Sequence, residues 1–268
     1  MLLQGKNAII YGGGGSLGGA VAGAFAEAGA RVFLVGRNSA PLEKRAALIK
    51  EKGGQAETAV VDALDEKNIG DYLEDLIRKT GSIDISFCAI GLEEVQQIPL
   101  VDLPLNDFIR PVHIAMQSYF LTAAAAAKHM RKQGSGVILS LTATPAPLAY
   151  PLVGGFGPAC AAIESLSRGL ATELGPYGIR VVNIRSGGSP DSRPFTDALS
   201  REPERAGKAI RKLEEDTMLK KLPLMADIAH VAVFLCSELA GKITGVTVDV
   251  TCGTTAGLNY TTMPMPFG

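Results

Sequence analysis

The stretch that decides the fold runs from Ala8 to Gly19 and reads AIIYGGGGSLGG. Its first part, Ala8–Tyr11, is a short apolar run typical of a buried strand, and a helical pattern begins near Ser16. A strand, a glycine-rich turn and a helix, in that order, place unpaired backbone N–H groups and the helix dipole where they favour a phosphate. The stretch predicts a turn that binds the pyrophosphate of a dinucleotide, with a flexible loop as the alternative.

Outward from this turn, short apolar runs alternate with helical patterns along the chain. The expected strands are Ala8–Tyr11, Val32–Val35, Ala59–Val61, Ile83–Ala89, Val137–Leu141, Ile179–Ile184 and Val246–Val250. The expected helices are about Ser16–Ala28, Pro41–Lys52, Glu66–Lys79, Asn106–Lys132, Phe156–Leu174 and Ala226–Leu239. This alternation predicts one α/β domain over residues 1–268, a Rossmann-type doubly wound parallel sheet of about seven strands with helices on both faces.

The bulk composition excludes several classes of protein. The chain has 268 residues, 47% of them hydrophobic, and a formal charge of −1, so nothing indicates nucleic acid or a membrane surface as partner. Its four cysteines form no CxxC pair, which predicts reduced thiols, a cytoplasmic location and no metal. We expect neither a signal peptide nor a membrane helix, since prolines interrupt the uncharged stretch between Lys132 and Glu164.

The least regular region runs from Gly188 to Leu222 and carries prolines and many charges. In a doubly wound sheet this region follows the C-terminal end of a strand, where ligands usually bind. We interpret residues 188–222 as a mobile segment on the side of a small-molecule substrate. A solvated surface helix without ligand contact is the other interpretation.

The end of the second expected strand bears on the choice of dinucleotide. It reads Val35-Gly36-Arg37-Asn38, without the acidic side chain that usually holds a free ribose 2′-hydroxyl. Gly36 leaves room, and Arg37 offers a planar cation suited to a 2′-phosphate. The sequence therefore favours NADP(H), with NAD(H) as the alternative, and Arg37 as a solvated loop residue is the simpler interpretation.

The order of these pieces resembles the short-chain dehydrogenase/reductase family over essentially the whole chain. The turn is similar to the family's TGxxxGxG motif, with Tyr11 in place of the threonine and Ser16 in place of the middle glycine. Cys88–Gly91 stands where the family has NNAG, and Asp62 matches its adenine-contacting acid. The resemblance implies cofactor contacts from Gly12, Gly14, Gly15, Ser16, Leu17, Gly18, Arg37, Asn38, Asp62, Ala63, Cys88, Ala89, Ile90, Gly91, Leu141, Cys160, Ser186, Gly187 and Gly188.

The four polar positions of the family's chemistry are all changed. Alignment with the family puts its catalytic tyrosine at Phe156, its lysine at Cys160, its serine at Ala143 and its asparagine at His113. Phenylalanine has no proton to give, and general acid catalysis alone is worth about 10²–10⁴ in rate. The family's carbonyl-reducing mechanism therefore does not carry over to these residues.

A subgroup of the family, the enoyl-thioester reductases, spaces its tyrosine and lysine differently and has a serine in the glycine turn. Ser16 and the run Phe156-Gly157-Pro158-Ala159 are similar to that subgroup. Its tyrosine would fall on Val153 and its lysine again on Cys160, so this route is incomplete too.

Three side chains remain as catalytic candidates near the expected nicotinamide end: His113, Thr142 and Tyr150, with Thr144 and Cys160 beside them. Each also has a structural interpretation, as a core or interface histidine, a threonine that closes a strand end, a tyrosine packed in a loop, or an inert buried thiol.

Three functional hypotheses follow. The first is an NADP(H)-dependent oxidoreductase that acts on a carbonyl/alcohol or enoyl substrate through a non-standard proton relay. The second is a catalytically inactive dinucleotide-binding homologue, a sensor or a structural subunit. The third is a pocket that has also lost the dinucleotide. The small residues of Leu121–Ala127 suit close helix packing, and the resemblance implies a homodimer or homotetramer.

Overall fold

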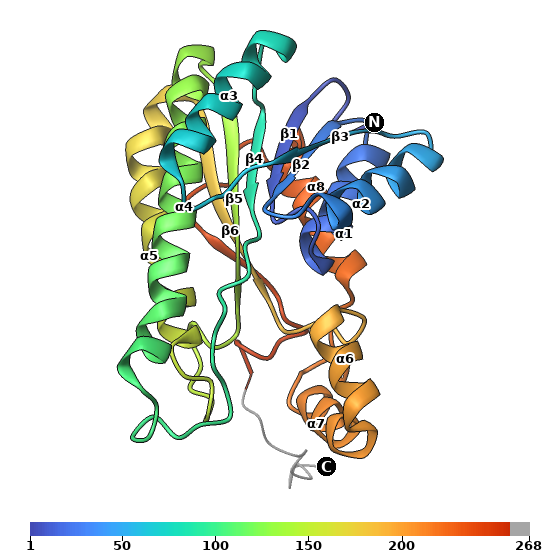
Figure 1. The fold of residues 1–268 in the computed structure, drawn as a ribbon, viewed down its shortest axis with the longest axis vertical. Helices are drawn as coiled ribbons and strands as arrows, with labels where there is room; N and C mark the ends of the chain where they lie inside the picture. Colours follow the sequence, from blue (N-terminus) through green and yellow to red (C-terminus); the bar gives the residue numbers. More distant parts are fainter. Residues whose placement is uncertain (258–268) are drawn as a thin grey trace, which may run out of the picture.

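The computed structural model describes residues 1–257. Within them, seven strands form one parallel sheet in the order β3-β2-β1-β4-β5-β6-β7 (Figure 1). The strands are β1 (Asn7–Tyr11), β2 (Arg31–Gly36), β3 (Gln55–Val60), β4 (Ile85–Cys88), β5 (Gly136–Ala143), β6 (Ile179–Ser186) and β7 (Thr247–Val250). The predicted Rossmann-type α/β fold is confirmed.

Helices cover both faces of the sheet, because neighbouring residues of the central strands point into two separate cores. In β1, Ala8 and Ile10 belong to one core, and Ile9 and Tyr11 to the other. The first core is closed by α1 (Ser16–Glu27), α2 (Ser39–Glu51) and α8 (Met225–Cys236), the second by α3 (Glu66–Thr80), α4 (Leu105–Gln133) and α5 (Phe156–Leu174). Two 3₁₀ turns cover Gly175–Tyr177 and Glu238–Ala240.

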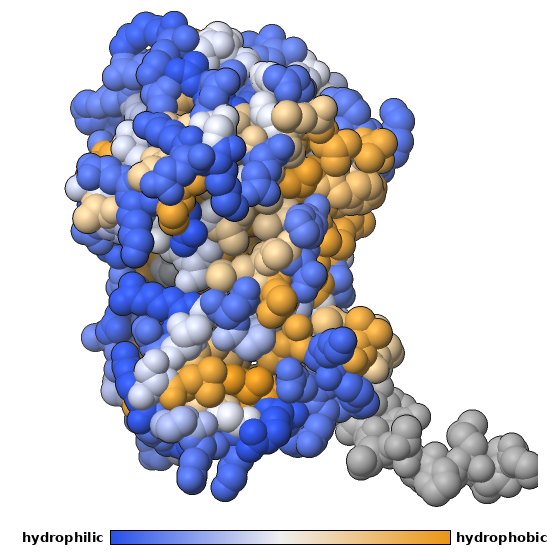
Figure 2. All heavy atoms as spheres, turned by 90° about the vertical axis from the view of Figure 1, so that its right-hand side faces the viewer, coloured by the Kyte–Doolittle hydropathy of each residue, from blue (hydrophilic) through white to orange (hydrophobic). Residues whose placement is uncertain are grey.

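The segment between β6 and α8 stands apart from these layers. It contains α6 (Arg193–Arg201) and α7 (Pro203–Glu215), which lie below the sheet in Figure 1. Much of residues 188–222 is therefore helical. Figure 2 faces this side of the molecule, where hydrophobic side chains gather among hydrophilic ones. Met218 and Leu219, just after α7, are exposed, so the segment also carries apolar surface.

The strand boundaries differ most from the prediction at the edge of the sheet. Ala59–Val61 was the expected third strand, whereas β3 spans Gln55–Val60. This strand is at the edge, and its burial alternates along the chain, so polar residues occupy part of it. A search for apolar runs therefore finds only its end. None of the helices within residues 1–257 combines the length and apolar character that a bilayer span requires.

The glycine turn lies at the point where the chain reverses its direction across the sheet. The chain runs from β1 outward to β3 and then returns to β4, beside β1. The connections that follow β1 and β4 consequently diverge and leave a crevice at the C-terminal edge of the sheet. Gly12 has a φ of +81°, and a Cβ there would overlap the carbonyl of Ala89. A Cβ at Gly18 would overlap the carbonyl of Gly12, so backbone packing itself requires both glycines.

Candidate active site

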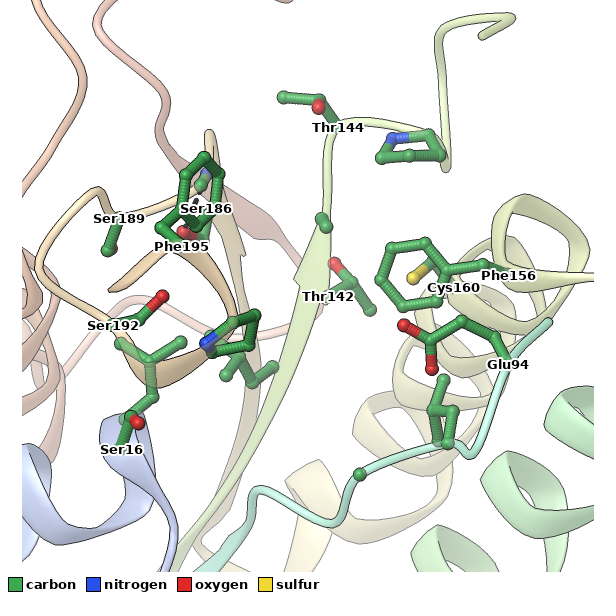
Figure 3. Close-up of a pocket in the computed structure, with 18 of the residues that line it drawn as sticks. Ser16, Glu94, Thr142, Thr144, Phe156, Cys160, Ser186, Ser189, Ser192 and Phe195 are labelled. Carbon is green, nitrogen blue, oxygen red and sulfur yellow. Dashed lines mark hydrogen bonds between the residues drawn. The ribbon is translucent and has the colours of Figure 1, made fainter. Parts of the chain in front are cut away.

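One cavity of about 960 Å³ opens at this edge of the sheet. Its walls come from the segments that follow β1, β4, β5 and β6 and from the first turns of α5 and α6 (Figure 3). It thus joins the glycine turn at one end to Phe156 at the other, and the side chains of Leu141, Val153 and Phe195 make much of it apolar. A concave, largely apolar cavity with few polar groups is typical of a small-molecule site.

The cavity brings together most of the residues expected to contact the cofactor. Those that line it are Gly15, Ser16, Leu17, Gly18, Ala89, Ile90, Gly91, Leu141, Cys160, Ser186, Gly187 and Gly188. Those that do not line it are Gly12, Gly14, Arg37, Asn38, Asp62, Ala63 and Cys88. The second group lies in and beside the glycine turn and at the ends of β2, β3 and β4, so the cavity holds only part of the expected contact surface.

At the end of β2, Arg37 is exposed and donates a hydrogen bond to Glu93 at 2.9 Å. Glu93 follows β4, and β1 lies between β2 and β4, so the pair spans the crevice above the glycine turn. Asp62 accepts a hydrogen bond from the backbone N–H of Leu64 at 3.0 Å and shapes the turn after β3. Exposed ion pairs are worth about 0–1 kcal/mol, so Arg37 remains available to an incoming anion.

Cys88 cannot contact a ligand through its thiol, which corrects the expectation from the NNAG position. The side chain is buried, and it faces Ser118 and Thr122 of α4 rather than the cavity. Burial raises the pKa of this thiol. The reason is the register of β4: Cys88 points toward the α4 side of the sheet, and the next residues, Ala89–Gly91, reach the cavity.

The substrate-side segment docks on the glycine turn. The backbone N–H of Arg193, the first residue of α6, donates to the Ser16 hydroxyl at 3.0 Å. Nearby, the buried Ser189 hydroxyl lines the cavity and has no hydrogen-bond partner among the described residues. A buried hydroxyl without a partner is costly, so this position calls for a polar ligand group. With the cradle at Gly15–Gly18, the residues present fit a dinucleotide.

The opposite wall carries the side chains at which we expected the family's polar groups. Phe156 and Cys160 lie on the first turns of α5, and Ala143 ends β5. Cys160 is only 1% exposed, and burial raises the pKa of its thiol to about 12, with further contributions from the carboxylates of Glu164 and Glu94. A thiol with so high a pKa stays protonated at neutral pH and is no nucleophile.

Thr142 belongs to this wall, but its hydroxyl is already engaged. It donates to Glu164 at 2.9 Å and accepts from the Asn183 amide at 2.7 Å. Arg185 donates to both carboxylate oxygens of Glu164, at 2.9 Å to Oε1 and 2.6 Å to Oε2, and also binds Asp249. Thr142 is therefore the cavity-lining end of a buried network that links β5, β6, β7 and α5.

His113 is not part of the site, contrary to the expectation from the family's asparagine position. It lies on the exposed side of α4 and does not line the cavity, whereas Ile114, Ala115 and Ser118 form the buried side. In α4 the neighbours of His113, Ile114 and Ala115, face the core, so the register of the helix turns His113 to solvent. The tyrosine of α4, Tyr119, does not line the cavity either. Its side chain is buried, and its hydroxyl is hydrogen-bonded to the Ser167 hydroxyl at 2.9 Å.

Tyr150, the third catalytic candidate, lines the cavity, and its hydroxyl makes no hydrogen bond with the described residues. Two features escaped sequence reasoning. Glu94 points into the cavity from the connection after β4, which carries no recognisable pattern (Figure 3). The Glu164–Arg185 pair had a usable signal, because an arginine within an otherwise apolar strand needs a buried partner.

Comparison with known proteins agrees with this geometry. Residues 13–255 match the family described as Enoyl-(Acyl carrier protein) reductase. The 7alpha-hydroxysteroid dehydrogenase of Escherichia coli is 32% identical over 96% of this chain and 97% of its own length. A peroxisomal 2,4-dienoyl-CoA reductase of Saccharomyces cerevisiae is 31% identical over 94% of this chain and 85% of its own.

Solved structures are similar over nearly the full length as well. Levodione reductase superposes with a TM-score of 0.88, at 28% identity, over 95% of this chain and 99% of its own. A xylitol dehydrogenase with bound NAD⁺ gives a TM-score of 0.87 at 25% identity, over 94% of this chain and 100% of its own. The chain therefore belongs to the short-chain dehydrogenase/reductase family and is an NAD(P)-dependent oxidoreductase of that type.

Proposed function

We propose that the protein is an NADP(H)-dependent oxidoreductase that acts on a carbonyl/alcohol or enoyl substrate without the family's tyrosine and lysine. The observation that carries this proposal is that one cavity runs without interruption from the glycine turn to Phe156. It offers a dinucleotide cradle and an apolar substrate wall in one continuous space. When bound there, the reduced nicotinamide would supply a hydride.

Two features support NADP(H) over NAD(H). Arg37 follows the end of β2, and no acidic residue stands beside it in the Gly36-Arg37-Asn38 stretch. Its one ion pair, with Glu93, joins two side chains that are 62% and 50% exposed. A 2′-phosphate carries more charge than that carboxylate and suits the guanidinium as a bidentate partner.

For a carbonyl or enoyl substrate, Tyr150 is the proton donor we propose. Of the three candidates, His113 lies outside the cavity, and the hydroxyl of Thr142 is held by Glu164 and Asn183. The hydroxyl of Tyr150 is free of such bonds within residues 1–257. Phe156 and Cys160 then shape the substrate wall, and Ser189 would bind a polar group of the dinucleotide.

The test is oxidation of NADPH by the wild type with a panel of ketones, aldehydes and enoyl thioesters, repeated with Tyr150→Phe. We expect turnover by the wild type and a loss of about 10²-fold or more in kcat for the variant, with NADPH affinity unchanged. Saturable NADPH binding with no turnover on any member would instead favour the inactive homologue. In that case Phe156→Tyr with Cys160→Lys should create carbonyl reduction.

We also propose self-association through the outer faces of α4 and α5, as a homodimer or homotetramer. Phe120 on α4 is 52% exposed, beside the small residues of Leu121–Ala127. A large apolar side chain next to small ones suits close helix packing between subunits. Light scattering on the wild type and on Phe120→Glu tests this: the variant should lose mass without losing helical signal.

A further inference from the structure

Glu94 lines the end of the cavity that we propose binds the substrate. It belongs to the connection between β4 and α4, and its carboxylate points into the cavity on the side of Phe156 and Cys160 (Figure 3). Glu94 also lies near enough to raise the pKa of the Cys160 thiol. A carboxylate and an aromatic ring therefore line the region that a tyrosine and a lysine occupy in the family.

The charge of Glu94 is not neutralised by the protein. Its one hydrogen bond within the described residues comes from the Gln96 side-chain amide at 3.3 Å, and no ion pair involves it there. The cation that lines this cavity, Arg193, is paired with Asp197 at 3.3 Å. Much of the surrounding wall is apolar, which strengthens the attraction of an unpaired carboxylate for a cation.

Resting on the NADPH site and hydride transfer of the proposed function, we propose that Glu94 and Phe156 form a cation site, and that an apolar iminium ion, the nitrogen counterpart of a carbonyl, is a further substrate of this cavity. The carboxylate attracts the positive nitrogen, and the ring face of Phe156 adds a cation–π contact. The replacement of the family's lysine by Cys160 removes the ammonium group that would repel such a substrate. Phe156 and Cys160 thus both favour a cation.

This substrate class also removes the need for the lost proton donor. The iminium carbon accepts a hydride from the reduced nicotinamide, and the electron pair of the C=N π bond becomes the lone pair of nitrogen. The product is a neutral amine, which takes its proton from water after the reaction. A ketone treated in the same way leaves an alkoxide that must be protonated in the site, which is the step the family's tyrosine serves.

The binding test uses ligands that differ mainly in charge, with no cofactor present. Calorimetry compares the N-methyl tetrahydroisoquinolinium ion with its uncharged isostere, methyltetralin, on the wild type, on Glu94→Gln and on Asp102→Asn. Asp102 lies in the same connection but does not line the cavity, so its variant controls for net charge. We expect Glu94→Gln to weaken the cation about tenfold or more and to leave methyltetralin unchanged. Equal weakening by Asp102→Asn, or none by Glu94→Gln, overturns the cation site.

The reaction test compares the N-methyl dihydroisoquinolinium ion with tetralone at equal NADPH. We expect the wild type to reduce the iminium ion, Glu94→Gln to do so with a raised KM, and Asp102→Asn to do so with the KM of the wild type. Reduction of tetralone but not of the iminium ion overturns this inference and leaves the proposed function intact. Failure of NADPH itself to bind overturns the proposed function, while the calorimetry still decides the cation site.

Discussion

The two ends of the cavity differ in what forms them: mainly backbone at the glycine turn, and side chains at Phe156. The glycine-turn end is mainly backbone: Gly15–Gly18 line the cavity, the N–H of Gly15 donates to the Gly12 carbonyl at 2.9 Å, and Gly12 and Gly18 are held against neighbouring carbonyls by packing. The Phe156 end is side chain, with Phe156, Cys160 and Thr142 in the wall and a buried ion pair behind. A backbone site survives many substitutions around it, whereas a side-chain site changes its chemistry with each one. On this basis a family member could keep a dinucleotide cradle even if all four polar positions changed, as the sequence predicts.

The largest effect is expected at the side-chain end. Arg185→Leu removes the partner of Glu164, whose side chain is 9% exposed, and leaves a buried charge unpaired. We expect the free energy of unfolding to fall by about 3–5 kcal/mol, measured by urea denaturation. The double variant Arg185→Leu with Glu164→Gln should be less destabilised than Arg185→Leu alone. If both variants lose the same free energy of unfolding, the Glu164–Arg185 pair is not what stabilises this wall of the cavity.

At the backbone end, Gly12→Ala should cost about 2–4 kcal/mol, because the residue has a positive φ and its Cβ would meet the Ala89 carbonyl. NADPH titration should show weaker binding as well. Gly23→Ala is the matched control, since a Cβ at that position of α1 meets nothing within 4 Å. It should leave stability unchanged or raise it by up to about 1 kcal/mol. Normal NADPH affinity in Gly12→Ala would show that the turn is not a backbone-defined site.

A smaller effect is expected where the backbone end depends on one side chain. Arg37→Gln should weaken NADPH binding about tenfold and leave NADH binding unchanged, as measured by fluorescence titration. Glu93→Gln should keep or slightly improve NADPH affinity, because it frees the guanidinium from an exposed ion pair. Equal losses of both cofactors in Arg37→Gln would assign that residue a structural role.

The smallest effect concerns β1, the strand that leads into the glycine turn. The Tyr11 hydroxyl is fully buried, and no hydrogen-bond partner is found for it among residues 1–257. Tyr11→Phe removes that group and should raise the unfolding free energy by about 1 kcal/mol. Tyr119→Phe removes a hydroxyl bonded to Ser167 and should lower it by about as much. Thermal melts of both variants show whether stability rises or falls. A loss of stability in Tyr11→Phe would show that the Tyr11 hydroxyl has a hydrogen-bond partner.

What the sequence predicts well is local. Ala8–Tyr11, the turn and the helix from Ser16 are read from neighbouring residues, and the structure has β1 and α1 within a residue of those positions. The order of strands and helices then implies the doubly wound sheet. The predicted third strand, Ala59–Val61, is shorter than β3. An edge strand has one solvated side, so polar residues interrupt the apolar run by which it would be found.

The candidate site depends on contacts between distant segments, and sequence order does not supply them. Glu164 and Arg185 are on different elements, and nothing in the chain links the arginine to that carboxylate rather than another. His113 was misplaced because a shift of one or two residues along α4 turns a side chain from the cavity to solvent. Glu94 sits in an irregular connection whose path is set by tertiary packing.

The hydrogen bond between Ser16 and the first N–H of α6 has a kinetic consequence. It closes the substrate-side segment over the place where a pyrophosphate would lie, so entry of the dinucleotide requires that bond to open. We therefore expect this contact to slow both entry and release of the dinucleotide. Ser16→Ala removes the contact and should speed dissociation of NADPH.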